Sequence, residues 1–201
     1  MHSTFNIQHS KLLKMILPVV AYGDPVLRKK GANIDKDYTG LEQLIENMFE
    51  TMYKSHGVGI AAPQVGKSIN LFVLDTAPFV EDEEKQVIPI KKVFINSEII
   101  EQTGTKWDFE EGCLSIPHIR ENVNRNPEIL IRYQDENFNH FEEKFDGITA
   151  RVIQHEYDHV KGILFVDHLS EFKKRLLKNR LLNITKGNID VSYKMRFPQS
   201  R

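Results

Sequence analysis

Apolar positions recur at helical spacing in three stretches of the chain. In the first stretch the apolar residues return every three or four positions, and they are Leu41, Leu44, Ile45, Met48, Met52 and Tyr53. This spacing is typical of a helix with one buried face. The pattern predicts helices over residues 41–56, 147–161 and 169–182, with a short helical turn over 24–30.

Shorter segments between these helices are rich in apolar, β-branched and aromatic residues. Asn, Asp and Gly residues that favour turns bound them. They predict strands, and their ranges are 69–74, 92–100, 103–109, 128–133 and 138–145. Neighbouring strands joined by short turns favour antiparallel sheets, so the expected class is α+β.

Composition fits one catalytic domain. The chain has 201 residues with 40% apolar content, enough for one sizeable core, and no low-complexity linker divides it. We expect a single domain over residues 15–201 and a disordered extension over 1–14. The apolar run from Met15 to Val20 is short and contains a proline, so it does not fit a secretory signal. No stretch is long enough to span a bilayer.

Charge adds little until the C-terminal region. Net charge is −1, so no global field favours a membrane or specific DNA as a partner. Basic residues gather over about 169–201, where the acids are Glu171 and Asp190. This helix and tail are either a solvated face or a dock for ribosomal RNA. The single cysteine cannot form an internal disulfide, which suits a reducing cytosol.

Residues 154–159 read Gln-His-Glu-Tyr-Asp-His. His155 and His159 are four residues apart, so they lie one turn apart on one helix face and can reach one ion. Ile148 and Val152 continue the same face, so the ion would lie inside the protein. Glu156 is adjacent and is a candidate general base acting on water. The expected fold is therefore α+β, with antiparallel β-sheets packed around a central metal-binding helix and a C-terminal helix.

The third metal ligand is sought upstream. Zinc proteases with this motif take a downstream ligand, but Phe165 stands three residues after Gly162, and no glutamate follows Glu171. Cys113, within Glu-Gly-Cys-Leu-Ser at 111–115, is the best candidate, because a thiolate binds zinc or ferrous iron strongly. Its alternative is a small buried apolar residue. Leu114 offers a main-chain N–H at the same place.

A third segment, residues 57–66, reads Gly-Val-Gly-Ile-Ala-Ala-Pro-Gln-Val-Gly. A helix precedes it and Pro63 would break a following one, so it does not fit a dinucleotide-binding loop. We interpret it as a glycine-permitted loop that brings the Gln64 amide against another part of the fold. A helix-to-strand connection without chemistry is the alternative.

Together the three segments resemble the three motifs of peptide deformylase. They are 57–64, 111–115 and 154–159, in the family's order, and the resemblance runs from about residue 16 to 182. Pro63 stands where many members have threonine, and the stretch 76–92 is longer and more acidic than a minimal member needs. Neither departure touches a candidate ligand.

The resemblance implies hydrolysis of the N-terminal formyl group from formylmethionine of newly synthesised polypeptides, with release of formate, in the bacterial cytoplasm. It implies Fe²⁺ on Cys113, His155 and His159, although these ligands also suit Zn²⁺, Ni²⁺ or Co²⁺. The ribosome would be a partner of the basic C-terminal helix. In our mechanistic hypothesis Glu156 moves the proton, while Gln64 and the Leu114 N–H hold the oxyanion.

The same resemblance suggests a substrate site. The methionine side chain would enter an apolar pocket, for which the candidates are Val58, Phe109, Ile148 and Val152. The candidates for contact with the substrate backbone are Gly59, Glu111 and Arg120. Crowding near Gly59 would exclude an acetyl group. Two other functions remain open: a zinc peptidase of the HExxH type and a non-catalytic metal-binding relative.

Overall fold

In the part of the chain that the structure describes, three α-helices form, as the apolar spacing predicted. The computed structural model describes residues 14–79 and 87–198. The helices are α1 (Leu41–Lys54), α2 (Gly147–Lys161) and α3 (Glu171–Thr185). Short 3₁₀ turns are η1 (Pro25–Arg28), η2 (Ala62–Val65), η3 (Ala77–Phe79) and η4 (Phe165–His168). Residues 1–13 of the expected extension and residues 80–86 of the acidic stretch lie outside the described residues.

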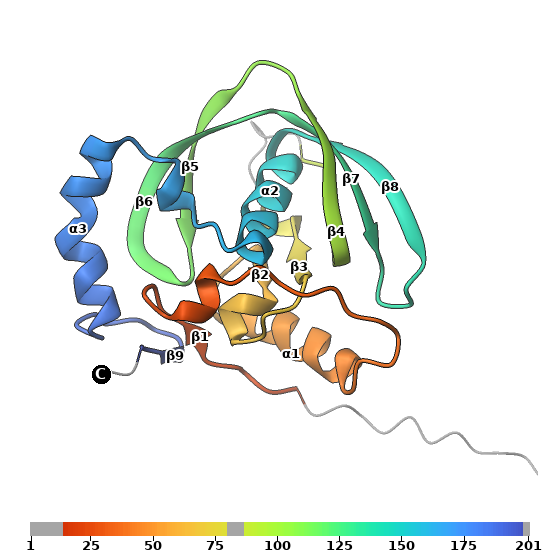
Figure 1. Ribbon diagram of the computed structural model, residues 1–201, viewed down its shortest axis with the longest axis horizontal. Coiled ribbons are helices and arrows are strands. Elements are labelled where there is room, and N and C mark those ends of the chain that lie inside the picture. Colours follow the sequence, from red (N-terminus) through yellow and green to blue (C-terminus); the bar gives the residue numbers. More distant parts are fainter. Residues whose placement is uncertain (1–13, 80–86, 199–201) are drawn as a thin grey trace, which may run out of the picture.

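The strands of the described residues form three sheets (Figure 1). The largest is antiparallel, in the order β2 (Gly59–Ala61), β3 (Leu71–Asp75), β4 (Lys91–Thr103), β7 (Glu128–Gln134) and β8 (His140–Asp146). The second is an antiparallel pair of β5 (Trp107–Cys113) and β6 (Ile116–Arg125). The third is a parallel pair of β1 (Val19–Val20) and β9 (Met195–Arg196), which joins opposite ends of the described chain.

One strand prediction was wrong in detail, and strands β1, β2, β6 and β9 were not predicted. The expected strand 103–109 spans a turn: Thr103 ends β4, and Gly104 turns the chain with a positive φ of 81° before β5 begins at Trp107. Strand β6 was not predicted at all. Its inward face carries Arg125 as well as Ile119 and Val123, so the alternation of apolar and polar residues is broken.

Helix α2 lies centrally, between the five-stranded sheet and the β5–β6 hairpin (Figure 1). One face packs Val152 and Ile153 into a cluster with Phe72 and Phe94 of the large sheet. The helix ends at Gly162, which adopts a left-handed conformation (φ 77°) and donates its N–H to the last carbonyls. The sequence therefore stops α2 directly after the histidine pair, with both rings on the hairpin side.

Helix α3 lies beside β6 (Figure 1). It buries Leu177, Leu181 and Ile184 in a cluster with Ile119 and Val123 of that strand. Within the described ranges, no helix is long and apolar enough to cross a membrane.

Candidate metal centre

Cys113 meets the two histidines of α2, as the motif analysis predicted. One ligand atom from each of Cys113, His155 and His159 lies within 4.8 Å of the others. Cys113 Sγ is 3.3 Å from His159 Nε2, and the two imidazole rings are 5.1 Å apart between centroids. Strand β5 delivers the sulfur at its last residue, and one turn of α2 delivers both nitrogens.

This trio fits a divalent ion. Metal–sulfur and metal–nitrogen bonds of about 2.3 and 2.0 Å at a tetrahedral angle would set the two atoms about 3.5 Å apart, close to the observed separation. His155 Nδ1 is bonded to Glu111 Oε2 at 2.9 Å, which leaves Nε2 for the ion. Thiolate and imidazole together suit zinc, ferrous iron, nickel and cobalt.

The trio also favours the thiolate that a metal requires. Burial raises the pKa of the Cys113 thiol, but the neighbouring His159 and His155 imidazoles outweigh burial and lower that pKa to about 5. The sulfur is therefore ready to coordinate at neutral pH without first losing a proton.

Glu156 lies beside the trio and has a free oxygen. Only 4% of the residue is exposed, and its Oε2 has no hydrogen-bond partner among the described residues. Burial raises its pKa to about 7, although His155 and His159 act in the opposite direction. A carboxyl group with a pKa near neutrality can both accept and return a proton. Gly59 makes room for it, because a Cβ at that position would lie 2.5 Å from Glu156 Oε1.

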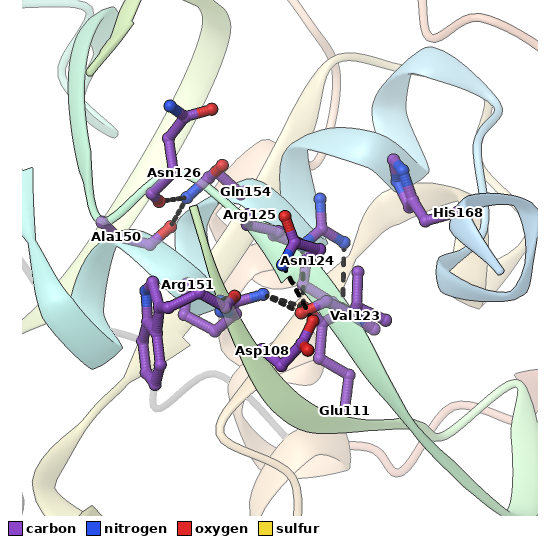
Figure 2. Close-up of polar contacts among 12 residues, drawn as sticks. Asp108, Glu111, Val123, Asn124, Arg125, Asn126, Ala150, Arg151, Gln154 and His168 are labelled. Atoms are coloured by element: carbon purple, nitrogen blue, oxygen red, sulfur yellow. Dashed lines mark hydrogen bonds and ion pairs between the residues drawn. The ribbon is translucent and has the colours of Figure 1, made fainter. Parts of the chain in front are cut away.

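Glu111 holds the first histidine in place rather than facing outward. Its carboxylate binds His155, and it also receives Arg125 Nε at 2.7 Å, Arg125 Nη2 at 3.0 Å and Arg151 Nη1 at 3.1 Å. Figure 2 shows the two arginines around this glutamate. The cations and the imidazole more than offset burial, so the pKa of Glu111 is strongly lowered. We predicted that Glu111 contacts the substrate backbone. Its carboxylate is instead bound to His155, Arg125 and Arg151 inside the protein.

The two arginines were missed by the sequence reasoning. Arg125 also binds Asp158 at 2.7 Å, while Arg151 donates to the carbonyls of Val123 and Trp107 and stacks 4.7 Å from the Trp107 ring. One residue of the motif could have indicated them. Asp158 directly precedes the second histidine on α2, and an acid that is largely buried needs a cationic partner such as an arginine.

Gln154 fixes the helix to the neighbouring turn. Its amide nitrogen donates to the carbonyl of Asn126 at 3.0 Å and to that of Ala150 at 3.1 Å, as Figure 2 shows. The histidine pair is thereby tied to the segment between β6 and β7.

Gln64 reaches the trio from η2, as predicted. Its Oε1 accepts the Ala61 N–H at 2.8 Å, and its Nε2 lies 3.4 Å from both Cys113 Sγ and Ser115 Oγ. The amide is buried and its orientation is fixed by the first of these bonds. Leu114 occupies the turn between β5 and β6, next to the cysteine.

A cavity of about 550 Å³ is lined by Cys113, His155 and Glu156. Of the predicted substrate residues, those that line it are Val58, Gly59, Phe109, Glu111, Arg120 and Val152. Ile148 does not: it is 7% exposed and packs in the core cluster with Phe72, because its position at the start of α2 lies too far from the cavity. Arg120 is exposed and pairs with Glu110. The cavity also has walls from the C-terminal tail, Val191 to Tyr193, which no sequence pattern predicted.

Comparisons with known proteins agree with this geometry. The family model for polypeptide deformylases matches residues 16–175. Curated peptide deformylases from Christiangramia forsetii and Flavobacterium johnsoniae are 58% and 51% identical over 193 residues each, which is 93% of this chain and 98% of each relative.

A solved structure adds the fold. The peptide deformylase from Thermus thermophilus superposes with a TM-score of 0.76 at 36% identity, covering 86% of this chain and 99% of that one. With the three motifs gathered around one cavity and the match extending over most of its length, the chain belongs to the peptide deformylase family.

Proposed function

We propose that this deformylase uses Glu156 as its proton carrier, beside a divalent ion held by Cys113, His155 and His159. The enzyme removes the N-terminal formyl group from newly synthesised polypeptides. The observation that carries the proposal is the unpartnered oxygen of Glu156 at the cavity, next to the three converging ligand atoms.

When bound, the ion supplies Lewis acidity, which makes water more acidic and polarises a carbonyl oxygen. Glu156 accepts a proton from the attacking water, whose oxygen forms the new bond to the formyl carbon. As the carbon–nitrogen bond breaks, Glu156 returns that proton to the departing amine. The products are formate and the free N-terminus. A pKa of about 7 for Glu156 suits both transfers.

Two donors of this chain would stabilise charge on the formyl oxygen. The Gln64 side-chain amide is fixed beside Cys113, and the Leu114 N–H belongs to the next residue along the chain. Each such donor contributes roughly 3 kcal/mol to lowering a barrier of this kind.

Substrate selection would depend on the walls of the cavity. Val58, Phe109 and Val152 offer an apolar surface for the methionine side chain, while Gly59 and Arg120 lie where the peptide backbone would pass. A formyl carbon carries only hydrogen, so a site crowded by Gly59 and its neighbours would exclude the larger acetyl group.

Fe²⁺ is the ion we propose for the living cell, and the bacterial cytoplasm is the proposed compartment. A reducing compartment suits both a ferrous ion and a free Cys113. Anaerobic purification followed by elemental analysis tests the metal. Zinc in place of iron, at full activity, would contradict the assignment.

Replacing Glu156 with glutamine tests the mechanism. We expect Glu156→Gln to bind one divalent ion per chain as the parent does and to lose about 10² to 10⁴ in kcat for formate release from formyl-Met peptides. The matched control is Glu142→Gln, a surface change on β8 whose carboxylate pairs with Arg132. Undiminished turnover in Glu156→Gln would refute the role. Cleavage of internal peptide bonds by the parent would favour the peptidase alternative.

Ribosome docking through α3 is a second proposal. Phe172 and Leu176 are each 64% exposed on this helix, among lysines and arginines. Deleting the helix is a poor test, since Leu177 and Leu181 belong to the core. Charge reversal of Lys178, with Phe172→Ser and Leu176→Ser, is expected to reduce co-sedimentation with ribosomes while peptide turnover stays unchanged. Unaltered co-sedimentation would end the idea.

A further inference from the structure

The chain beyond α3 returns to the metal centre. After Thr185 it turns at residues 186–187 and bends at residues 192–193, and its residues Val191 to Tyr193 line the cavity. Pairing with β1 anchors it, since Val19 N donates to Lys194 O at 2.8 Å and Ala21 N donates to Arg196 O at 2.9 Å. Tyr193 is therefore held in place by backbone hydrogen bonds on its C-terminal side.

Tyr193 reaches the turn that carries Cys113. Its hydroxyl donates to the carbonyl of Leu114 at 2.8 Å. The N–H of the same peptide group belongs to Ser115 and donates to Cys113 Sγ at 3.4 Å. A peptide group is planar, so the direction of its carbonyl also fixes the direction of its N–H. One hydroxyl in the tail thus orients one donor to the ligand sulfur.

We propose that Tyr193 is a positioning residue for the metal site: its hydroxyl fixes the Leu114–Ser115 peptide group and thereby keeps the Ser115 N–H bonded to the Cys113 sulfur. The inference rests on the metal site proposed above. Hydrogen bonds to a ligand sulfur draw electron density from it and tune the bound metal, and such outer partners also set affinity.

The surroundings support this arrangement. Ser115 is fully buried, and its own carbonyl accepts the Tyr22 N–H at 2.8 Å, so one side of the turn is already fixed. The Leu114 carbonyl, on the other side of the turn, is bound by the Tyr193 hydroxyl. Burial, and then the nearby Cys113 charge, raise the pKa of the Tyr193 hydroxyl, which therefore keeps its proton and remains a donor at neutral pH.

The test compares Tyr193→Phe with the parent, both loaded with Co²⁺. Removing the hydroxyl should free the peptide group and weaken the N–H···S bond. We expect the sulfur-to-cobalt charge-transfer band to move to longer wavelength and the Kd for Co²⁺ to rise about tenfold. Circular dichroism of the metal-free proteins checks that both are folded.

Tyr133→Phe is the matched control, because it removes a hydroxyl bonded to Glu143 in the five-stranded sheet, away from the trio. An unmoved band and a Kd within twofold of the parent in Tyr193→Phe would overturn the inference. An equal change in Tyr133→Phe would overturn it as well. A parent without any sulfur-to-cobalt band would instead refute the metal site itself.

A second measurement needs no variant. In ¹⁵N-labelled parent protein loaded with Zn²⁺, the Ser115 amide is expected to exchange with deuterium at least tenfold more slowly than an unbonded amide. Exchange at the unbonded rate would contradict the proposed N–H···S bond.

Discussion

At the scale of single residues, the site depends on the close contact between Gly59 and Glu156, which leaves no space for a side chain on the glycine. Gly59 has no side chain, and a methyl group there would lie 2.5 Å from Glu156 Oε1 and 2.8 Å from its Cδ. The glycine was expected to crowd the substrate. The structure adds that it also bounds the space in which the carboxyl group sits.

Gly59→Ala should therefore displace Glu156. We expect kcat/KM for formyl-Met peptides to fall at least 100-fold with metal content unchanged, since a shift of about 1 Å in a catalytic group costs that much. Gly57→Ala is the comparison, because its added methyl would meet Leu114 Cδ1 at 3.0 Å and only ordinary contacts at 3.4 Å, with no atom of Glu156 among them, and a smaller loss is expected. Equal losses in the two variants would argue against a specific contact with Glu156.

At the scale of elements, buried charges join β5, β6 and α2 around the metal ligands. Arg125 of β6 forms ion pairs with Glu111 of β5 and Asp158 of α2 at the same time, and the Arg125 and Glu111 side chains are 6% and 4% exposed. Without Arg125, Glu111 keeps Arg151 and His155, and Asp158 keeps His168, but each buried or partly buried carboxylate loses an arginine at 2.7 Å.

Arg125→Met should lower the free energy of unfolding by about 3 to 5 kcal/mol, measured by urea denaturation. Arg120→Met is the contrast. Arg120 also pairs with a glutamate across β5 and β6, but both side chains are at least 60% exposed, so its loss should cost less than about 1 kcal/mol. Similar losses in both variants would mean that burial does not strengthen the pairing.

Glu111 gives the fold an acid dependence of known sign. Its folded-state pKa is lowered below the ordinary 4.5, so the unfolded chain binds more protons in that window. The stabilisation is present above about pH 4.5 and is lost as pH falls toward the lowered value. Glu111→Gln should be less stable than the parent at pH 7, and the difference should shrink below pH 4.5. A difference that stays constant with pH would show that folding does not shift the pKa of Glu111.

Element boundaries show what a sequence can and cannot predict. The predicted range of α2 is confirmed at both ends, because Gly162 and a steady apolar stripe mark it. Strand β6 was not predicted because Arg125 breaks the alternation of apolar and polar residues. That arginine is buried because Glu111 and Asp158 bind it. Arg125 lies 14 and 33 positions from these two acids in the sequence, so no local pattern could predict the ion pairs.

In the candidate site, too, some residues could be predicted from the sequence and others could not. The trio Cys113, His155 and His159 follows from spacing and ligand chemistry, and Glu156 follows from its neighbour. The contact between Tyr193 and Leu114 joins residues 79 positions apart and needs the tertiary structure.

At the scale of the whole molecule, a bound ion would join the β5–β6 hairpin to α2. Ligands that bind only the native state stabilise it by mass action, by about 2.7 kcal/mol at 100 times Kd. For a chain of this size that corresponds to a rise of roughly 5 to 10 °C in Tm.

We expect added Ni²⁺ to raise the Tm of chelator-treated protein by that amount. Cys113→Ser should abolish most of the rise, since it removes one of the three ligands. A rise of the same size in Cys113→Ser would place the binding elsewhere.

The parallel pairing of β1 with β9 sets an order of events during synthesis. Because β9 follows every other described element, it leaves the translating ribosome last, and Tyr193 comes only just before it. A partly made chain can already hold Cys113, His155 and His159 but still lacks the tail that closes over their turn. The contact of Tyr193 with the turn that carries Cys113 can therefore form only after all three candidate ligands have been synthesised.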